Sequence, residues 1–143
     1  MQQAAVAYLA NGTLVVAPII QTTAGLGLEV EPIVVEPHEP SIIAAALSSA
    51  LSRSGRAVPH PSQDEWKGFF KPFLDAVGVR SGRAFMKDAI RVEIRVAGDR
   101  LELTPQRNLG SNRGFEPLPD LAVNAPRGDY PAAAAAILSM FGG

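Results

Sequence analysis

Residues 90–104 read I-R-V-E-I-R-V-A-G-D-R-L-E-L-T, and this stretch decides the fold. Apolar and polar residues alternate on both sides of Gly98-Asp99, which is typical of two strands that each bury one face. A two-residue turn there pairs Ala97 with Arg100, Val96 with Leu101, Arg95 with Glu102 and Ile94 with Leu103. The apolar residues then share one face and Arg95 meets Glu102 on the other, so the stretch predicts a β-hairpin at about 90–104.

The residues before this hairpin predict further strands. Residues 4–9 and 14–17 flank the turn signal Asn11-Gly12, which favours a first hairpin. Residues 28–31 alternate as a half-buried strand does. Pro32 should keep that strand at an edge or end it, because proline has no N–H to donate to a neighbouring strand.

Two helices are predicted between these strands and the central hairpin. Ser41 is a good N-cap for the first, whose apolar residues recur every four positions until Gly55. Ser62 and Glu65 have the spacing of a capping box at the start of the second. Pro72 should break or kink that second helix, and residues 81–89 then predict a short helical turn.

The remainder of the chain predicts one loop, one weak strand and one helix. Residues 105–115 are rich in Gly, Asn and Arg, and residues 118–123 favour a strand that Pro119 weakens. Asp129 can cap a last helix with Pro131 in its first turn, where the missing N–H does no harm. The sequence therefore predicts an α+β fold, as a single domain over residues 1–143 with a mainly antiparallel sheet.

Composition excludes several kinds of chemistry. The 143 residues include no cysteine, which excludes disulfides, thiolate metal sites and cysteine nucleophiles. The two histidines, His38 and His60, are too few for a three-histidine zinc site and lie in proline-rich, exposed-looking segments. No dinucleotide or phosphate-binding glycine motif is present. We therefore predict a protein that is not an enzyme, with no catalytic residue, cofactor or metal.

Charge is nearly balanced overall but divided along the chain. The net charge is −1, with −4 in residues 1–66 and +5 in residues 67–115. The near-neutral total argues against a dedicated nucleic-acid binder, without excluding an RNA-binding patch in the middle segment. The first ten residues lack a basic secretory start and no apolar run approaches about 18 residues. We therefore expect a cytoplasmic protein without a membrane partner.

Residues 106–115 form the candidate binding loop that the residues themselves suggest. Arg107, Asn108, Asn112 and Arg113 could hold phosphate or RNA, since arginine offers a fork of donors. The alternative is a structural loop in which glycines make the turns and Phe115 returns to the core.

Three segments of the chain carry a resemblance to a known family: E-P-H-E-P-S-I-I-A-A-A-L-S-S-A-L-S-R-S at 36–54, W-K-G-F-F-K-P-F-L-D-A-V-G-V-R-S-G-R-A-F-M-K at 66–87, and L-T-P-Q-R-N-L-G-S-N-R-G-F at 103–115. They resemble segments of immunity proteins of bacterial contact-dependent growth inhibition systems. The resemblance implies a cytoplasmic inhibitor that binds and neutralises the C-terminal domain of a cognate toxin. Many such toxins are nucleases with basic clefts, and the family has no catalytic signature.

An acidic surface would suit a basic toxin domain and speed the encounter. The candidates are Glu36 and Glu39, together with Asp64 and Glu65. Prolines 37 and 40 stiffen the arm that carries the first pair, so little conformational entropy is lost on docking. The alternative is that these acids solvate a loop and the start of a helix. Toxin neutralisation is thus the leading hypothesis, and a small RNA- or phosphate-binding module that uses the 106–115 loop is the alternative.

Overall fold

The computed structural model describes residues 3–142, apart from the side chains of Trp66 and Lys67, and contains the predicted central hairpin. β6 (Ile90–Ala97) and β7 (Arg100–Asn108) pair in the predicted register, with Ile94 and Leu103 fully buried. Arg95 and Glu102 lie opposite each other on the other face. Their ion pairs run along the strands instead, from Arg95 to Glu93 at 3.3 Å and from Glu102 to Arg100 at 3.9 Å.

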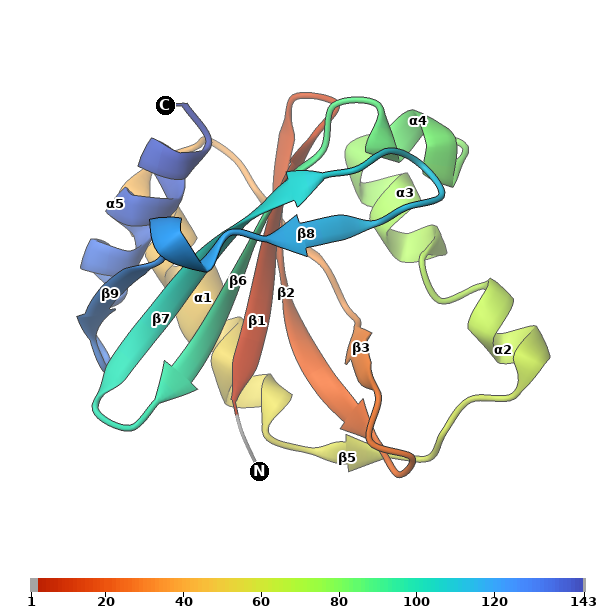
Figure 1. Ribbon diagram of the computed structural model, residues 1–143, viewed down its shortest axis with the longest axis horizontal. Coiled ribbons are helices and arrows are strands. Elements are labelled where there is room, and N and C mark those ends of the chain that lie inside the picture. Colours follow the sequence, from red (N-terminus) through yellow and green to blue (C-terminus); the bar gives the residue numbers. More distant parts are fainter. Residues whose placement is uncertain (1–2, 143) are drawn as a thin grey trace.

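The two hairpins join in the middle of one curled, mainly antiparallel sheet (Figure 1). β1 (Ala4–Ala10) pairs with β2 (Thr13–Thr22) as predicted, and β1 also pairs with β6. The order β3-β2-β1-β6-β7-β8 places β3 (Gly27–Glu29) and β8 (Phe115–Pro117) at the two edges. Three short strands pair outside this path: β4 (Ile33–Val35) and β5 (Ala57–Val58) with β2, and β9 (Val123–Pro126) with β7. Only the β2–β5 pair is parallel.

Helices α1 (Pro40–Ser54) and α5 (Tyr130–Met140) cover one face of the sheet. Ile43, Leu47 and Ile137 pack there against Ile94 and Leu103, and all five are fully buried. The alanine run of α5 buries Ala133 and Ala134 in the same core, because small side chains let the helix approach closely. This face is the main hydrophobic core of the domain.

The opposite face is covered only in part. α3 (Lys71–Val77) and α4 (Gly82–Met86) bury Phe73 and Phe85 against Tyr8 and Val15. α2 (Gln63–Lys67) lies further from the sheet. No helix lies over the ends of β1, β2 and β6 that are near the N-terminus (Figure 1). On this face Val6 of β1 and Ala17 of β2 are fully buried, so the part that remains open to solvent lies on β6 and β7, where Glu93, Arg95 and Glu102 are partly exposed.

The helices differ from the prediction in number and start. α1 begins at Pro40 with Glu39 as its N-cap and without a side-chain cap, so Ser41 lies inside the first turn. Four helices precede β6 rather than two, because the predicted second helix is broken into α2 and α3, as Pro72 indicates, and the helical turn predicted at 81–89 forms α4. The break lies before Pro72, which falls in the first turn of α3. The capping box is confirmed: the Ser62 N–H donates to Glu65 at 3.0 Å, and the Glu65 N–H donates to the Ser62 hydroxyl at 3.2 Å.

The segment after the hairpin also differs. β7 continues to Asn108, so the predicted 105–115 loop shrinks to 109–114 between β7 and β8. The predicted strand at 118–123 is wrong: the 3-10 helix η1 (Pro119–Leu121) takes its place, and β9 starts only at Val123. Asp129 caps α5 as predicted, accepting from the Ala132 N–H at 3.1 Å. The α+β, mainly antiparallel, single-domain prediction is confirmed for the described residues.

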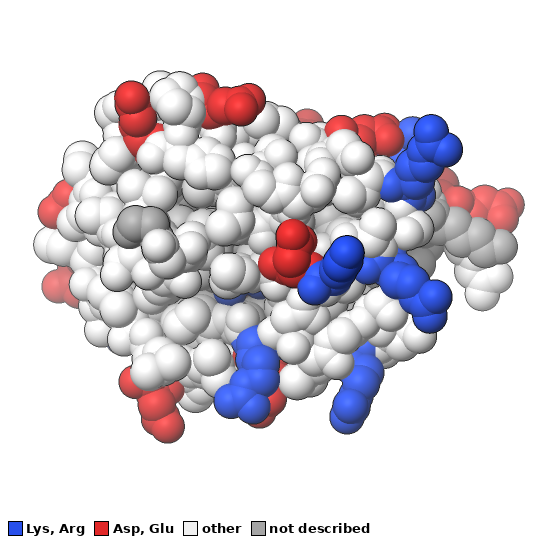
Figure 2. Space-filling view, turned by 90° about the horizontal axis from the view of Figure 1, so that it is seen from above, with Lys and Arg blue, Asp and Glu red and all other residues white. Residues whose placement is uncertain are grey.

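The uneven charge of the sequence is visible on the surface. Figure 2 shows the molecule from above the view of Figure 1, and its Lys and Arg side chains gather in the half where Figure 1 has α4. None of the helices described in residues 3–142 is long and apolar enough to cross a membrane.

Candidate functional site

Four strands bring a polar cluster together on the partly covered face of the sheet. Tyr8 of β1 pairs with Arg91 of β6, and Arg91 pairs in turn with Gln106 of β7. Glu29 of β3 reaches the same place from the sheet edge. The Tyr8 hydroxyl donates to Glu29 Oε1 at 2.6 Å, and the Arg91 guanidinium donates to Tyr8 at 3.1 Å, to Glu29 at 3.1 Å and to Gln106. We call these four residues the polar cluster.

Burial and charge fix the protonation states within the polar cluster. Burial, followed by the charge of Glu29, raises the pKa of Tyr8 far above its ordinary value of 10, so the hydroxyl stays protonated and donates. Burial by itself would lower the pKa of Arg91, but the carboxylate of Glu29 and the contact with Tyr8 raise it overall. Arg91 and Glu29 thus form an ion pair, with side chains 13% and 23% exposed. Tyr8 acts as a hydrogen-bond donor here and is unsuited to be a general base.

Aromatic rings enclose the polar cluster. The guanidinium carbon of Arg91 lies 5.6 Å from the ring centre of Tyr8 and 5.9 Å from that of Phe115, within range of cation–π attraction. Phe70 and Phe85 meet the Tyr8 ring edge-on. Phe115 thus returns to the core from the loop before it, as the structural interpretation of that loop predicted. A hollow of about 190 Å³ opens beside Glu29, bounded also by Gly27, Leu28, Phe69 and Phe70.

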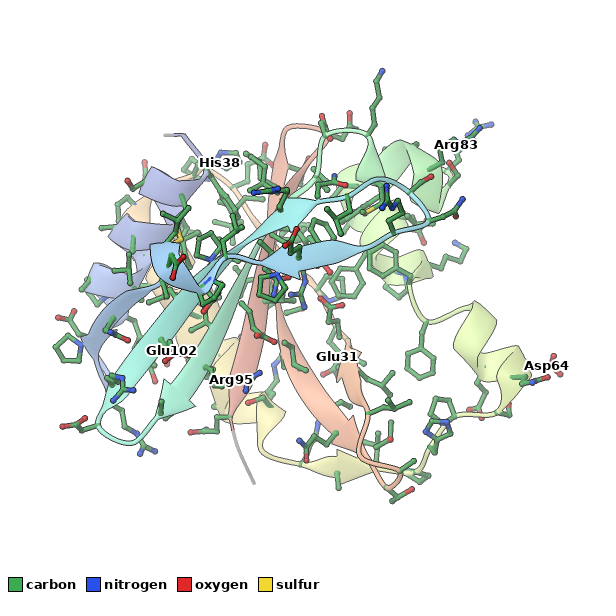
Figure 3. All side chains as sticks on the ribbon, in the orientation of Figure 1. Glu31, His38, Asp64, Arg83, Arg95 and Glu102 are labelled. Atoms are coloured by element: carbon green, nitrogen blue, oxygen red, sulfur yellow. The ribbon has the colours of Figure 1, made fainter. Side chains whose placement is uncertain are left out.

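The rest of this face continues the polar surface. Glu93, Arg95, Glu102 and Thr104 project from β6 and β7 beyond the polar cluster, and we call these four residues the polar sheet face. Figure 3 shows the side chains of Arg95 and Glu102 on β6 and β7, where no helix lies over them. Because paired strands hold their backbones, these donors and acceptors are presented rigidly, which suits recognition of a partner.

The structure separates the four predicted acidic residues into two places. Glu36 and Glu39 precede α1, whereas Asp64 and Glu65 follow it, and a helix of 15 residues spans about 22 Å. Figure 3 shows His38 of the arm and Asp64 on different sides of the molecule. The Ser62 backbone N–H, with its hydroxyl, lowers the pKa of Glu65, whose carboxylate serves the capping box. Only Glu36 and Glu39 therefore form an acidic pair on the arm.

The predicted basic loop is also rearranged. Arg107 and Asn108 lie on β7, and only Asn112 and Arg113 lie in the 109–114 loop. The Asn108 amide nitrogen donates to the carbonyls of Met86 at 2.7 Å and Ala89 at 3.0 Å, and its oxygen accepts from the Gly110 N–H at 2.8 Å. Asn108 thus ties the loop to α4, and its predicted role in ligand binding stays a prediction.

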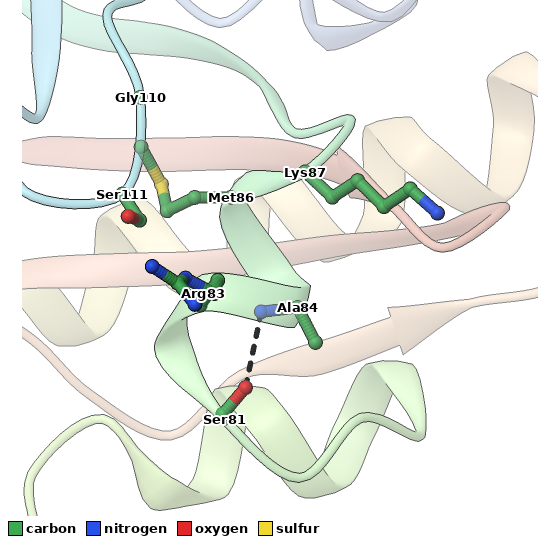
Figure 4. Close-up of a pocket in the computed structure, with 7 residues that line it drawn as sticks. All are labelled: Ser81, Arg83, Ala84, Met86, Lys87, Gly110 and Ser111. Atoms are coloured by element: carbon green, nitrogen blue, oxygen red, sulfur yellow. Dashed lines mark hydrogen bonds between the residues drawn. The ribbon is translucent and has the colours of Figure 1, made fainter.

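A groove lies between α4 and the 109–114 loop. Its volume is about 440 Å³, and its lining residues are Ser81, Arg83, Ala84, Met86, Lys87, Gly110 and Ser111 (Figure 4). We call it the α4 groove.

The two histidines lie apart from both places. Both are exposed, and His60 Nδ1 lies 3.2 Å from the Thr22 hydroxyl. No three His, Asp or Glu side chains converge as in a metal site within residues 3–142.

Sequence reasoning missed the polar cluster. The alternation in 28–31 and 90–104 places Glu29 and Arg91 on strands, but nothing local indicates that they meet. β2 and β1 lie between β3 and β6, so Glu29 and Arg91 meet only because the sheet curls, and the curl and the strand order come from long-range pairing.

Comparison with known proteins identifies the fold. No known family profile and no curated protein sequence matches this chain. A protein of unknown function from Neisseria meningitidis superposes with a TM-score of 0.76 at 13% identity, over 98% of this chain and 93% of that chain. A chain from the CdiA-CT/CdiI toxin and immunity complex of Yersinia pseudotuberculosis gives a TM-score of 0.75 at 14% identity, over 98% of this chain and 95% of that chain. The fold is therefore shared, over nearly full length, with a chain of a toxin–immunity complex.

Proposed function

We propose that this protein is an immunity protein, which binds the toxin domain of a contact-dependent growth inhibition system and neutralises it in the cytoplasm. The observation that carries the proposal is the nearly full-length fold match to a chain of a CdiA-CT/CdiI complex. The sequence resemblance is a second line of support. Its three segments correspond to the arm with α1, the run from α2 to α4, and the end of β7 with the loop to β8.

The role proposed is binding rather than catalysis. The residues of the polar cluster are bonded to one another, and Tyr8 keeps its proton at neutral pH. A rigid network of this kind fixes the shape of a surface, whereas a catalytic base needs a pKa near the working pH.

The polar sheet face is the surface that we propose for the toxin domain. It carries both signs of charge on a curved sheet that no helix covers, and the polar cluster fixes one side of it. The acidic pair Glu36 and Glu39 is a second candidate surface, supported by the net charge of −4 in residues 1–66.

A charge exchange on the polar sheet face tests both the function and the surface. Arg95→Glu with Glu102→Arg keeps opposite charges across the strand pair, although it places a like charge beside Glu93 and beside Arg100. Because all four side chains are at least 25% exposed, water screens this repulsion and the fold should survive while the surface seen by a partner is reversed. The matched control is Lys71→Glu with Asp75→Lys, which exchanges an exposed ion pair of 2.8 Å on α3. Each protein is titrated with the toxin domain encoded next to its gene, using isothermal titration calorimetry.

The expected result is tight binding by the wild-type protein and by the control, and binding at least about tenfold weaker by the exchanged protein. Absence of wild-type binding would contradict the proposed function. Equal binding by all three proteins would leave the function standing and remove the polar sheet face as its surface.

A further inference from the structure

The cations of this protein divide into two groups by their partners. Most described Lys and Arg side chains bind an acid or a backbone carbonyl: Arg53, Arg56, Lys71, Arg91, Arg95, Arg100 and Arg127. The others make no ion pair or side-chain hydrogen bond within the described residues: Arg80, Arg83, Lys87, Arg107 and Arg113. Arg80, Arg83 and Lys87 lie in or next to α4, Arg107 lies near the end of β7, and Arg113 lies in the 109–114 loop. Figure 2 shows basic side chains gathered in the half of the molecule that contains α4.

The α4 groove lies in the middle of this second group. Arg83 and Lys87 line it, Arg80 precedes α4, and Arg113 belongs to the facing loop. Figure 4 shows Arg83 close to Ser111, whereas the Lys87 side chain extends from the rim away from both. Its volume of about 440 Å³ is that of a small-ligand site.

Local hydrogen bonds hold the groove in shape before any ligand arrives. Asn108 joins the Gly110 N–H of the loop to the Met86 and Ala89 carbonyls at the end of α4. The Leu109 N–H donates to the Gly114 carbonyl at 2.9 Å, which closes the loop on itself. A preformed site of this kind loses little conformational entropy on binding.

The lining residues offer donors and no carboxylate. Arg83 has a forked guanidinium, and the hydroxyls of Ser81 and Ser111 are free to donate, since Ser81 only accepts from the Ala84 N–H. The nearest acid in sequence, Asp88, accepts from the Asn11 N–H at 3.0 Å. A phosphate group, with several acceptor oxygens and up to two charges, matches this mixture of forked and single donors.

We propose that the α4 groove binds phosphate groups, presented by single-stranded RNA or by a small phosphorylated molecule. The unpaired cations continue beyond the groove, with Arg80 before α4 and Arg113 in the facing loop. Binding several successive phosphates of a nucleic-acid strand requires such a row of cations. The near-neutral total charge conceals this site because the acids lie elsewhere or are already paired. This binding goes beyond toxin neutralisation and does not depend on it.

Fluorescence anisotropy with a labelled oligouridine of about ten nucleotides tests the RNA source. We expect the wild-type protein to bind, and its affinity to fall about 20-fold between 50 and 200 mM salt if three phosphates are contacted. Arg83→Ala with Lys87→Ala should weaken binding at least about tenfold and reduce the salt dependence. The control Arg100→Ala with Arg127→Ala removes the same charge beside the turn of the central hairpin, where both side chains are exposed, Arg100 pairs with Glu102 and Arg127 donates to the Gly98 carbonyl.

Amide chemical shifts recorded with inorganic pyrophosphate test the small-molecule source. Shifts at Ser81, Gly110 and Ser111 without RNA binding would support a phosphate site for a small molecule. The proposal is overturned if neither RNA nor pyrophosphate binds, or if both double variants weaken RNA binding equally. It is also overturned if an oligoglutamate peptide binds the groove more tightly than either phosphate probe, because the site would then be a protein-docking site.

Discussion

Replacing Arg91 with methionine removes the cation that holds the polar cluster together. Methionine keeps much of the aliphatic length between β6 and the Phe115 ring, so the change acts mainly on charge and hydrogen bonds. Glu29 loses its ion pair of 3.1 Å, and Tyr8 and Gln106 each lose a donor.

The expected cost follows from the burial of the pair. Removing one partner of a buried ion pair costs about 3–5 kcal/mol. Because the Glu29 side chain is 23% exposed and still accepts from the Tyr8 hydroxyl, water and Tyr8 offset part of this cost. We therefore expect Arg91→Met to lower the free energy of unfolding by about 2–3 kcal/mol.

Urea unfolding followed by circular dichroism measures this loss. The matched control is Arg95→Met on the same strand, where the side chain is 44% exposed and its ion pair should contribute less than about 1 kcal/mol. Adding Glu29→Gln to Arg91→Met should restore part of the lost free energy of unfolding, because the Glu29 carboxylate is then no longer buried without its cation. If Arg91→Met costs no more than Arg95→Met, or if Glu29→Gln restores nothing, the polar cluster is not the coupled network described above.

Three further predictions concern pH, the core and the arm. Burial raises the pKa of Tyr8 above the value of 10 that it has when unfolded. Its contribution to the free energy of unfolding is therefore complete below about pH 10 and declines at higher pH. Tyr8→Phe should make the free energy of unfolding, measured by urea titration, fall less steeply between neutral and alkaline pH. Ile94→Asp places an unpaired charge at a fully buried position, and its cost of several kcal/mol should leave the domain unfolded by circular dichroism, whereas a folded variant would refute the hairpin register. If the acidic arm steers the toxin domain, Glu36→Lys with Glu39→Lys should associate more slowly at low salt in stopped-flow measurements, and an unchanged rate would remove the arm from the encounter surface.

Local patterns predicted the local structure well. The 90–104 alternation fixed the hairpin register because a one-residue slip would have moved Ile94 and Leu103 to the wrong face. The Ser62–Glu65 spacing predicted a capping box, and Pro72 predicted a break in the second helix. Each of these features depends on residues that are neighbours in the chain.

The candidate site depended on contacts between distant residues, which local patterns do not contain. Arg91 and Glu29 look like ordinary polar positions of two strands, and only the curl of the assembled sheet brings them together across β2 and β1. The sequence places Asn108 in a glycine-rich loop, whereas in the structure β7 extends to Asn108 and its amide bonds the end of α4. Glu36 and Asp64 looked like one acidic region because α1, which separates them, has no acidic residue of its own.

Growth of bacteria that express the adjacent toxin domain tests the central proposal most directly. The toxin domain is induced with this protein, with the Arg95→Glu and Glu102→Arg exchange, or with an empty vector. The account predicts that the wild-type protein restores growth and that the exchanged protein, present at the same folded level, restores much less. Arrested growth with the wild-type protein, at a level where it is folded and soluble, would contradict the proposed immunity function.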